Sequence, residues 1–183
     1  MKYCSSCGQP LVFTTPPGDS RERFVCRHCD TVHYQNPRVI TGCLVSWQDQ
    51  VLLCRRDIDP RSGYWTLPAG FLENGETAQA GAIRETWEEA RARVVVEDLY
   101  TLFSLPHISQ IYMFYRGRLE TPVFDAGEET REVALFREDE IPWDELAFPV
   151  IRETLLHYFQ DRVENHFPVR AKDIIVDRNR QRR

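Results

Sequence analysis

The chain has 183 residues and a formal net charge of −5, with 42% apolar and 28% charged residues. This mixture is typical of a globular protein and excludes an intrinsically disordered chain. No stretch reaches the ~18 consecutive apolar residues that a membrane-spanning helix requires, and the first residues lack an apolar signal segment. The sequence therefore predicts a cytoplasmic protein, with no membrane partner, built from one ordinary domain and a small module.

Charge is distributed unevenly along the chain. Four of the last six residues are arginines, and without them the net charge becomes −9: Arg178, Arg180, Arg182 and Arg183. A body this acidic repels a phosphate backbone, so nucleic acid is an unexpected partner. The same body can hold divalent cations that in turn hold phosphates. The basic end is interpreted as a solvated terminus, with an anionic partner as the alternative.

The predicted elements begin with a loop-like segment at 1–36, which carries many Gly and Pro turns and few apolar side chains. Two strands at 39–47 and 51–54 follow, joined by the polar turn 48–50 as a hairpin. After a loop rich in Pro and Gly, residues 77–93 are predicted to form a helix. The first domain boundary is therefore placed between residues 36 and 37.

The second half continues the alternation of strands and helices. Apolar runs predict further strands at 94–96, 99–105, 110–119 and 132–136, and a second helix at 149–160 with Pro149 in its first turn. Strands before, between and after the helices predict a mixed sheet with helices packed on it. The main domain is expected to span 37–163, followed by a partly basic tail at 164–183 without fixed structure.

Two cysteine pairs punctuate the first segment. Cys4-x2-Cys7 and Cys26-x2-Cys29 are separated by 18 residues, a spacing that strongly indicates a four-thiolate tetrahedral zinc site. A closed shell of four sulfurs leaves no position for water, so this zinc is expected to be structural. His28 and His33 lie nearby as further candidate ligands, and four buried reduced cysteines are the alternative.

Three glutamates lie on one face of the predicted helix 77–93. Glu85, Glu88 and Glu89 are spaced i, i+3 and i+4. Their mutual repulsion disfavours the helix unless a cation relieves it, and carboxylate oxygens are the ligands that Mg²⁺ and Mn²⁺ prefer. A solvated acidic face is the alternative. The opposite face is expected to pack on the sheet through four side chains: Ala80, Ile83, Trp87 and Ala90.

The glutamates belong to a longer motif. The segment resembles the Nudix box, G-x5-E-x7-R-E-U-x-E-E-x-G-U, at six positions: Gly70, Glu76, Arg84, Glu85, Glu88 and Glu89. Arg91 stands where the box has its second glycine, which normally supplies a left-handed helix cap. The good helix propensity of residues 91–93 predicts that the helix instead runs on.

The resemblance covers nearly residues 1–160. Three further segments look similar to zinc-ribbon Nudix enzymes, in particular plant chloroplast FAD pyrophosphatases and their bacterial relatives: Tyr34-Gln-Asn-Pro-Arg-Val-Ile, Trp65-Thr-Leu-Pro-Ala-Gly and Asp139-Glu-Ile-Pro with Leu146-Ala-Phe. It implies an α/β fold, the Nudix α/β/α sandwich with a mixed sheet, preceded by a zinc ribbon. It also implies a small nucleotide substrate, and the sequence is compatible with a homodimer.

The implied activity is metal-dependent hydrolysis, with Mg²⁺ or Mn²⁺, of the pyrophosphate bond in a nucleoside-diphosphate-linked compound. FAD or ADP-ribose is favoured, releasing AMP. NADH enzymes of the family carry Gln-Pro-Trp-Pro-Phe-Pro where this chain has Leu105-Pro-His-Ile-Ser-Gln, and Pro106 agrees with the ADP-ribose type. An NADH pyrophosphatase or an NAD-capped RNA decapping enzyme is the alternative. A nucleotide sensor that binds nucleic acid is the alternative of another class.

The resemblance also assigns site residues. Glu85, Glu88 and Glu89 are implied as catalytic metal ligands, with the Ala69 carbonyl completing the site and Glu129 as a further ligand or base. Gly70, Glu76 and Arg84 are implied as supports, since a guanidinium does not bind a metal. Stacking and phosphate contacts are expected from four residues around the box and the nearby strands: Arg55, Tyr64, Trp65 and Tyr112.

Overall fold

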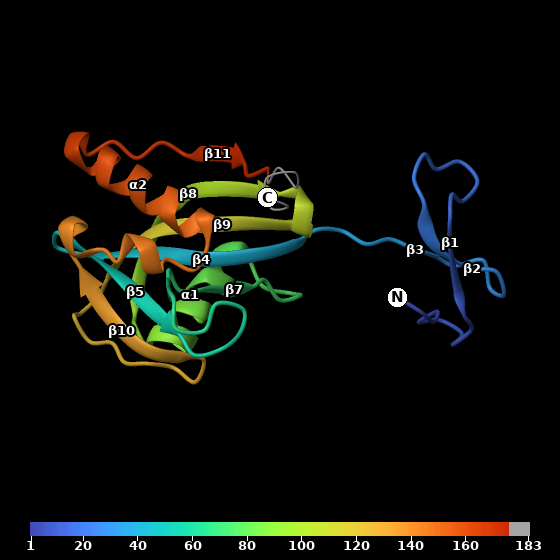
Figure 1. Cartoon of the computed structure of the whole chain (residues 1–183), viewed down its shortest axis with the longest axis horizontal. Coiled ribbons are helices and arrows are strands. Elements are labelled where there is room, and N and C mark those ends of the chain that lie inside the picture. Colours follow the sequence, from blue (N-terminus) through green and yellow to red (C-terminus); the bar gives the residue numbers. More distant parts are fainter. Residues whose placement is uncertain (176–183) are drawn as a thin grey trace. The chain divides into compact units, whose positions relative to one another are not determined.

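The computed structural model describes residues 1–175 (Figure 1). Its contacts divide the chain into two compact units, of which the first comprises Met1–Pro37 and the second begins at Arg38. Among the described residues, no helix is both long enough and apolar enough to cross a bilayer. The four arginines near the end of the sequence lie outside the described residues.

The first unit contains a small antiparallel sheet rather than loops alone. Its strands are β1 (Leu11–Thr14), β2 (Arg23–Cys26) and β3 (Val32–His33), paired in that order. Phe13 lies opposite Phe24 across β1 and β2, with ring centroids 5.0 Å apart. Such cross-strand pairs stabilise short strands, and the sequence pattern did not indicate them because each strand is too short to show an alternation.

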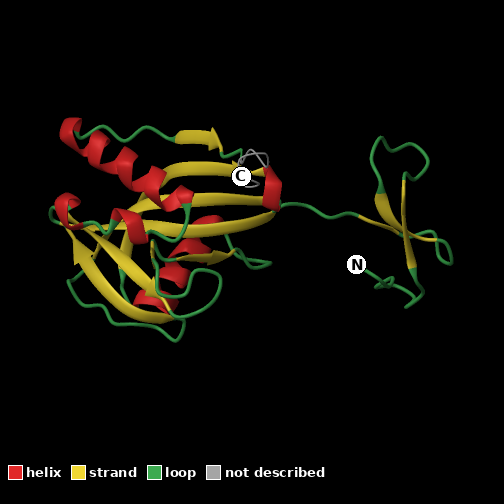
Figure 2. Ribbon diagram, viewed as in Figure 1, coloured by secondary structure: helices red, strands yellow, loops and turns green. Residues whose placement is uncertain are grey.

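The second unit is built on one mixed sheet, with helices on it as Figure 2 shows. The strand order is β10-β5-β4-β9-β8-β11, with β6 paired to β5 and β7 paired to β4. β4 and β9 run parallel, as do β8 and β11, and the other pairs are antiparallel. The bounds are β4 (Arg38–Trp47), β5 (Gln50–Arg56), β6 (Trp65–Thr66), β7 (Ala69–Phe71), β8 (Val94–Leu105), β9 (Gln110–Leu119), β10 (Thr130–Phe136) and β11 (Arg170–Asp173).

The two main helices, α1 (Ala78–Ala90) and α2 (Pro149–Glu164), cover opposite faces of this sheet. Leu44 and Leu53 belong to a core cluster with Leu155 of α2. Their chain neighbours Cys43 and Cys54 belong to a second cluster with Ala82 of α1. Since successive strand residues point to opposite faces, the two clusters lie on the two sides of the sheet. The expected α/β/α sandwich is therefore confirmed.

Helix α1 differs from its prediction at its end and in its orientation. It ends at Ala90, and Arg91 caps it in the left-handed conformation, with φ 49° and ψ 24°. Ile83 and Trp87, expected to pack on the sheet, are 39% and 43% exposed. The buried face is instead the one that carries Gly81, because a Cβ there would lie 2.8 Å from Thr41 Cγ2 of β4. The glutamate face thus turns toward the sheet.

Two other expectations change. The strands predicted at 94–96 and 99–105 form one strand, β8, with irregular pairing between Val96 and Thr101. The expected tail without fixed structure is corrected at β11, which extends the sheet as a parallel edge strand. Arg170 holds it by hydrogen bonds to the buried Asp161 carboxylate on α2.

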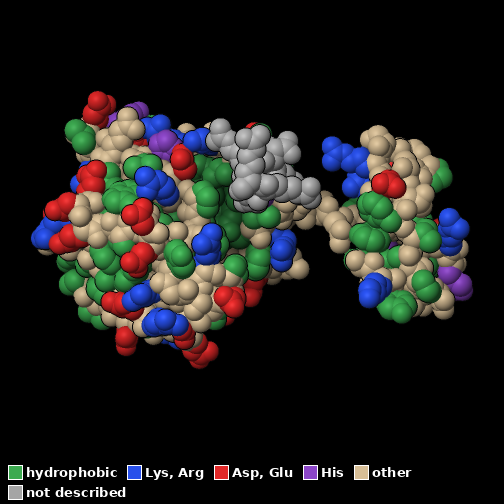
Figure 3. All heavy atoms as spheres, in the orientation of Figure 1, with side chains coloured by type: hydrophobic (Ala, Val, Ile, Leu, Met, Phe, Trp, Pro, Cys, Tyr) green, Lys and Arg blue, Asp and Glu red, His purple; other side chains and the backbone are tan. Residues whose placement is uncertain are grey.

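Charged side chains of both signs are interspersed over the visible face of the second unit (Figure 3). Many of them pair on the surface: Arg137 with Asp49, for example, at 3.1 Å, and Arg131 with Asp57 at 2.7 Å. Such exposed pairs contribute little to stability. These exposed pairs therefore give little indication of a functional site, and buried charged side chains are better candidates.

Candidate functional site

Four cysteine sulfurs converge in the first unit. The Sγ atoms of Cys4, Cys7, Cys26 and Cys29 all lie within 4.8 Å of one another. Cys4 Sγ is 3.7 Å from Cys29 Sγ, and Cys7 Sγ is 3.5 Å from Cys26 Sγ. Tetrahedral zinc with bonds of about 2.3 Å holds its sulfurs about 3.8 Å apart, so the donor set fits zinc. His33 Nε2 lies 3.3 Å from Cys4 Sγ and can orient that sulfur.

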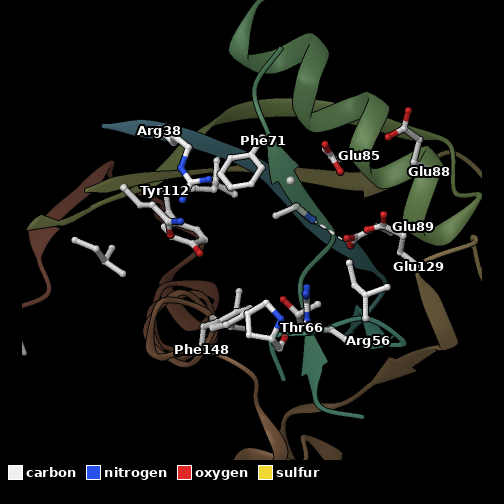
Figure 4. Close-up of a pocket in the computed structure, with 18 of the residues that line it drawn as sticks. Arg38, Arg56, Thr66, Phe71, Glu85, Glu88, Glu89, Tyr112, Glu129 and Phe148 are labelled. Atoms are coloured by element: carbon white, nitrogen blue, oxygen red, sulfur yellow. Dashed lines mark hydrogen bonds between the residues drawn. The ribbon is translucent and has the colours of Figure 1, made fainter. Parts of the chain in front are cut away.

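The second unit contains a cavity of about 1150 Å³. Figure 4 shows its arrangement, with Glu85, Glu89 and Glu129 on one side and Arg38, Phe71 and Tyr112 on the other. A further side is formed by Arg56, Thr66 and Phe148. Ligand sites commonly have volumes of about 300–1,000 Å³, so the cavity has room for an extended ligand.

Two of the glutamates on α1 are buried. Glu85 is 9% exposed and Glu89 is 8% exposed, whereas the Glu88 side chain is 52% exposed. Burial raises the pKa of Glu89 to about 8, while a hydrogen bond from the Ala69 N–H, at 3.2 Å from Oε2, opposes the shift. Burial also raises the pKa of Glu85. Both carboxylates are therefore placed where a nearby positive charge stabilises them most.

Arg84 supplies part of that charge. Its Nη1 donates to Glu85 Oε1 at 2.7 Å and to Glu88 Oε2 at 3.0 Å. Its Nη2 donates to Glu76 Oε1 at 2.7 Å and to the Phe71 carbonyl at 3.1 Å. The guanidinium thus ties the helix to β7 and bridges the carboxylates of Glu85 and Glu88. Among residues 1–175, the only group of potential ligand atoms that lie close enough together to hold a metal ion is the cysteine cluster.

Gly70 lies directly beside the Glu85 carboxylate. A Cβ at this position would overlap both carboxylate oxygens of Glu85. Gly70 pairs with Thr41 in the β4–β7 ladder, which fixes its backbone. The position therefore requires glycine because of this close approach, not because of a positive φ.

Glu129 reaches the cavity from the loop between β9 and β10. The Gly127 N–H donates to the Glu89 carbonyl at 3.0 Å, and the Asp125 N–H donates to the Ala90 carbonyl at 2.9 Å. The loop thereby satisfies carbonyls that α1 leaves free at its C-terminus. On its other side, the Asp57 N–H donates to the Glu129 carbonyl at 2.9 Å. These contacts bring Glu129 to the glutamates of α1.

The opposite side combines cations with aromatic rings. The Arg38 guanidinium lies 4.8 Å from the Phe71 ring centroid, and that of Arg56 lies 5.4 Å from the Phe148 centroid. Within residues 1–175, neither arginine forms an ion pair with a carboxylate. Burial raises the pKa of Tyr112, and the charges of Arg56 and Arg38 oppose this shift. Positive charge is therefore available to an anionic ligand.

The expected substrate contacts are only partly placed at the cavity. Tyr112 lines it. Trp65 is corrected, since it is 6% exposed and packs edge-on against Phe136 in the core. Arg55 and Tyr64 do not line the cavity either. The Arg55 guanidinium instead pairs with the Glu132 carboxylate, with Nη1 3.4 Å from Oε2.

The alternation of side chains along β5 explains why Arg56, and not the expected Arg55, lines the cavity. Successive strand residues face opposite sides, so Arg56 faces the cavity while Arg55 faces away. The sequence showed two adjacent arginines but not which one faces inward. It also gave no role to Arg38 or Phe148, although both belong to segments that carried the resemblance.

Comparisons with known proteins agree with this geometry. A family model described as "Nudix N-terminal" matches residues 2–35, and one described as "NUDIX domain" matches residues 36–159. The NAD-capped RNA hydrolase NudC of Edwardsiella ictaluri is 34% identical over 95 residues, which are 51% of this chain and 34% of that protein. The same-named protein of Salmonella heidelberg is 26% identical over 147 residues, 77% of this chain and 53% of that protein. The chain thus spans about half the length, or less, of these curated relatives.

Solved structures are also similar. The crystal structure of a NUDIX hydrolase from Nitrosomonas europaea has 49% sequence identity and a TM-score of 0.90, covering 95% of this chain and 100% of that one. An ADP-ribose pyrophosphatase from Streptococcus suis has 20% identity and a TM-score of 0.60, covering 75% of this chain and 100% of that one. The second similarity concerns the fold alone.

Proposed function

We propose that this chain, which belongs to the NUDIX domain family of pyrophosphohydrolases, cleaves the P–O–P bridge of a nucleoside-diphosphate-linked compound in the cavity described above. The observation that carries the proposal is the pair of buried glutamates, Glu85 and Glu89, facing arginines across one cavity. Carboxylates on one side suit cations that bind phosphates, and arginines suit the phosphates themselves.

The residues present fit Mg²⁺ or Mn²⁺. We assign the ligands to the carboxylates of Glu85, Glu88, Glu89 and Glu129 with the Ala69 carbonyl. Burying an ionised carboxylate without a counter-charge is costly, and the raised pKa of Glu89 expresses that cost. When bound, the cation screens the phosphates and lowers the pKa of the attacking water.

We assign the remaining steps of the hydrolysis to side chains of this protein. Water adds to one phosphorus, and the bond from that phosphorus to the bridging oxygen breaks, which leaves two phosphate monoesters. Glu129 is exposed at the cavity edge, and we assign it the role of accepting the proton from the water where it does not itself bind the cation. Arg56 lies close enough to the glutamates to lower the pKa of Glu89 electrostatically, so it can neutralise a phosphate at the bridge.

The first candidate substrates are FAD and ADP-ribose, since both join an ADP half to a second group through phosphates. The ring faces of Phe71 and Tyr112 suit an adenine or flavin. Free NAD or NAD-capped RNA is the second candidate, and the similarity to the NAD-capped RNA hydrolases NudC favours it. The segment Leu105–Gln110 lacks the aromatic signature of NADH enzymes, which supports the first candidate.

The test is a substrate panel with products identified by mass. Wild-type protein with Mg²⁺ is expected to yield AMP with FMN from FAD, or AMP with ribose 5-phosphate from ADP-ribose. Chelation should stop the reaction. A higher kcat/KM for NAD or NAD-capped RNA would move the second candidate ahead. If no pyrophosphate-bridged nucleotide is cleaved with Mg²⁺ or Mn²⁺, hydrolysis is excluded and a nucleotide-sensing regulator takes its place.

A further inference from the structure

Four neighbouring strands each contribute one residue to the same row along the cavity. Arg38 of β4 lies opposite Gln110 of β9, and Gln110 lies opposite Leu105 of β8. β11 continues this row, because the Ile174 N–H donates at 2.8 Å to the carbonyl of Ser104, the residue before Leu105. All four residues of the row line the cavity, Ile174 included. The cavity therefore extends across the sheet from β4 as far as β11.

The far end of this row is distant from the glutamates of α1. Gly42 of β4 pairs with Ala69, whose N–H donates to the Glu89 carboxylate. Arg38 lies four residues earlier on β4, about 13 Å along the strand, and three strand spacings add about 14 Å from Arg38 to Ile174. These two displacements are nearly perpendicular. A ligand must therefore be extended to contact both Glu89 and Ile174.

The end of the cavity at Ile174 is apolar. Ile174 packs against the core cluster that contains Leu105 and Ile151 of α2, and all three side chains line the cavity. Ile108, from the 3-10 turn η1 (Pro106–Ile108), is exposed and also lines it. An apolar group that covers such a surface removes it from water, which is favourable. This end therefore suits a ring of a ligand, whereas the glutamate end suits cations and phosphates.

Contacts with α2 hold β11 in place. Arg170, the first residue of β11, donates at 2.9 Å to the buried Asp161 carboxylate. Phe167, which precedes the strand, stacks on Tyr158 with ring centroids 5.8 Å apart. A group that is already fixed before a ligand arrives contributes to binding without a further ordering cost. Ile174 is preorganised in this way at the end of the cavity.

We propose that Ile174 contacts a terminal ring of the substrate and determines specificity, with Arg170 as the positioning residue that fixes β11. This inference rests on the proposed function, since it concerns the same cavity. The ring is the adenine or the ring of the group beyond the bridge, because both are flat and present apolar faces. β11 is then part of the substrate cavity, although the sequence predicted no fixed structure for this segment.

The test compares Ile174→Ala with Ile175→Ala. Ile175 is the matched control, because it is the next residue, is 79% exposed and does not line the cavity. KM and kcat are measured for FAD, ADP-ribose and NAD with Mg²⁺. Ile174→Ala should raise KM about 10-fold, as expected for apolar groups removed from a pocket. It should leave kcat unchanged, because the ring takes no part in the reaction.

The three substrates identify which ring lies at Ile174. An increase in KM for all three places the adenine there, since all three contain it. An increase for FAD and NAD but not for ADP-ribose places the second ring there, since ADP-ribose lacks it.

Two further variants separate substrate contact from folding. Ile174→Leu keeps the apolar volume and should keep the wild-type KM. Arg170→Gln weakens the attachment of β11 to Asp161 and should raise KM for the same substrates as Ile174→Ala. Equilibrium binding of FAD in EDTA, followed by flavin fluorescence, gives the same comparison without turnover.

Three outcomes overturn the inference while the enzyme class stands. Ile174→Ala keeps the wild-type KM for every substrate that the wild-type protein cleaves, Ile175→Ala raises KM equally, or Ile174→Ala lowers kcat with KM unchanged. If the wild-type protein cleaves none of the three substrates, the proposed function fails instead, and the FAD titration in EDTA still tests Ile174. The two failures are therefore distinguishable.

Discussion

Glu89 illustrates at the scale of one residue how surroundings define a role. The side chain is 8% exposed and its carboxylate accepts a hydrogen bond from the Ala69 N–H. Glu88, one residue earlier, is half exposed and bonded to Arg84. The two glutamates are equivalent in the motif but not in the fold. The buried one should depend most on a bound cation, since water screens it least.

Replacing Glu89 by Gln keeps the shape and removes the charge. We expect Glu89→Gln to fold normally, because a buried neutral amide costs less than a buried carboxylate. Turnover should fall about 10²–10⁴-fold, since metal binding and the activation of water by the metal both weaken. Glu164→Gln, at an exposed position at the end of α2, is the matched control. Near-normal turnover of Glu89→Gln at saturating Mg²⁺ would contradict the assigned role.

Gly70 gives a second prediction at this scale. The group that a Cβ would meet is the far end of the flexible Glu85 side chain, so Gly70→Ala should move the carboxylate rather than unfold the protein. A misplacement of about 1 Å can cost 10²-fold in rate. We expect a comparable loss in kcat/KM and weaker Mn²⁺ binding, with Tm nearly unchanged. A drop in Tm with normal Mn²⁺ affinity would show that Gly70 serves packing instead.

At the scale of elements, the end of α1 allows a clean test of backbone strain. Arg91 adopts the left-handed conformation, and its N–H donates to the Trp87 carbonyl at 2.9 Å. A side chain in this conformation costs about 1 kcal/mol that glycine avoids. Arg91→Gly should therefore raise Tm by about 2–4 °C. Arg91→Ala removes the same side chain but keeps the strain, so it should show no such gain. An equal effect of both variants would locate the change in the side chain.

The attachment of β11 gives a prediction with a pH dependence. Asp161 accepts hydrogen bonds from Arg170 and, at 2.8 Å, from the Tyr100 hydroxyl. Hydrogen bonding from Arg170 lowers the pKa of Asp161. The stabilisation is therefore complete above the unfolded pKa of about 3.9 and is lost as pH falls through the lower folded value. Asp161→Asn should destabilise the protein by about 1–3 kcal/mol at pH 7.

Urea unfolding measures this difference, which should shrink between pH 5 and pH 2. Glu153→Gln is the matched control on the same helix, α2, because it breaks the pair that Glu153 forms with Lys172 of β11. Exposed pairs contribute at most about 1 kcal/mol. If the two variants lose equal stability, Asp161 does not hold β11.

The elements differ in how far the sequence could predict them. The strand expected at 110–119 has those bounds, and that expected at 39–47 begins one residue earlier. Both could be predicted because a mostly apolar run bounded by polar turn residues is typical of a buried strand. β11 could not be predicted, since Arg170-Ala-Lys-Asp has no apolar alternation. It forms because its backbone pairs with the edge of β8 and because Arg170 donates hydrogen bonds to the Asp161 carboxylate. Arg91 was mispredicted for a similar reason, since the N–H groups of Asp125 and Gly127, which donate to the last helix carbonyls, end the helix where propensity alone would continue it.

The site residues also differ in how far the sequence could predict them. Fixed spacing on one helix brings the glutamates together, and a motif records such spacing. Arg38 and Phe148 are 110 residues apart in sequence and reach one cavity through strand register and helix docking. Single-sequence patterns carry no record of such pairings. The arginine and aromatic side of the cavity, which we propose contacts the substrate, could therefore be identified only from the structure.

The whole molecule consists of two units that are stabilised by different means. The second unit has two apolar clusters made entirely of residues beyond Arg38, among them Leu44, Phe103 and Leu155. In the first unit the buried residues are few, and two of them are the thiols Cys4 and Cys26. A unit this small gains too little from burial alone. The cation between its sulfurs must supply the missing stability, which for structural zinc is about 10–16 kcal/mol.

The final prediction follows from this difference between the units. Freshly purified, reduced protein should contain one zinc per chain, and Cys4→Ser should lose it, because three sulfurs bind more weakly. Hydrogen exchange should then accelerate in β1–β3 while β4 and β9 stay protected, since their core contains none of the lost contacts.

Cys43→Ser is the matched control. Cys43 is fully buried against α1, so a hydroxyl there should weaken the second unit and leave the zinc in place. Absence of zinc from the wild-type protein would refute the assignment, and equal acceleration in both units would show that they do not fold independently.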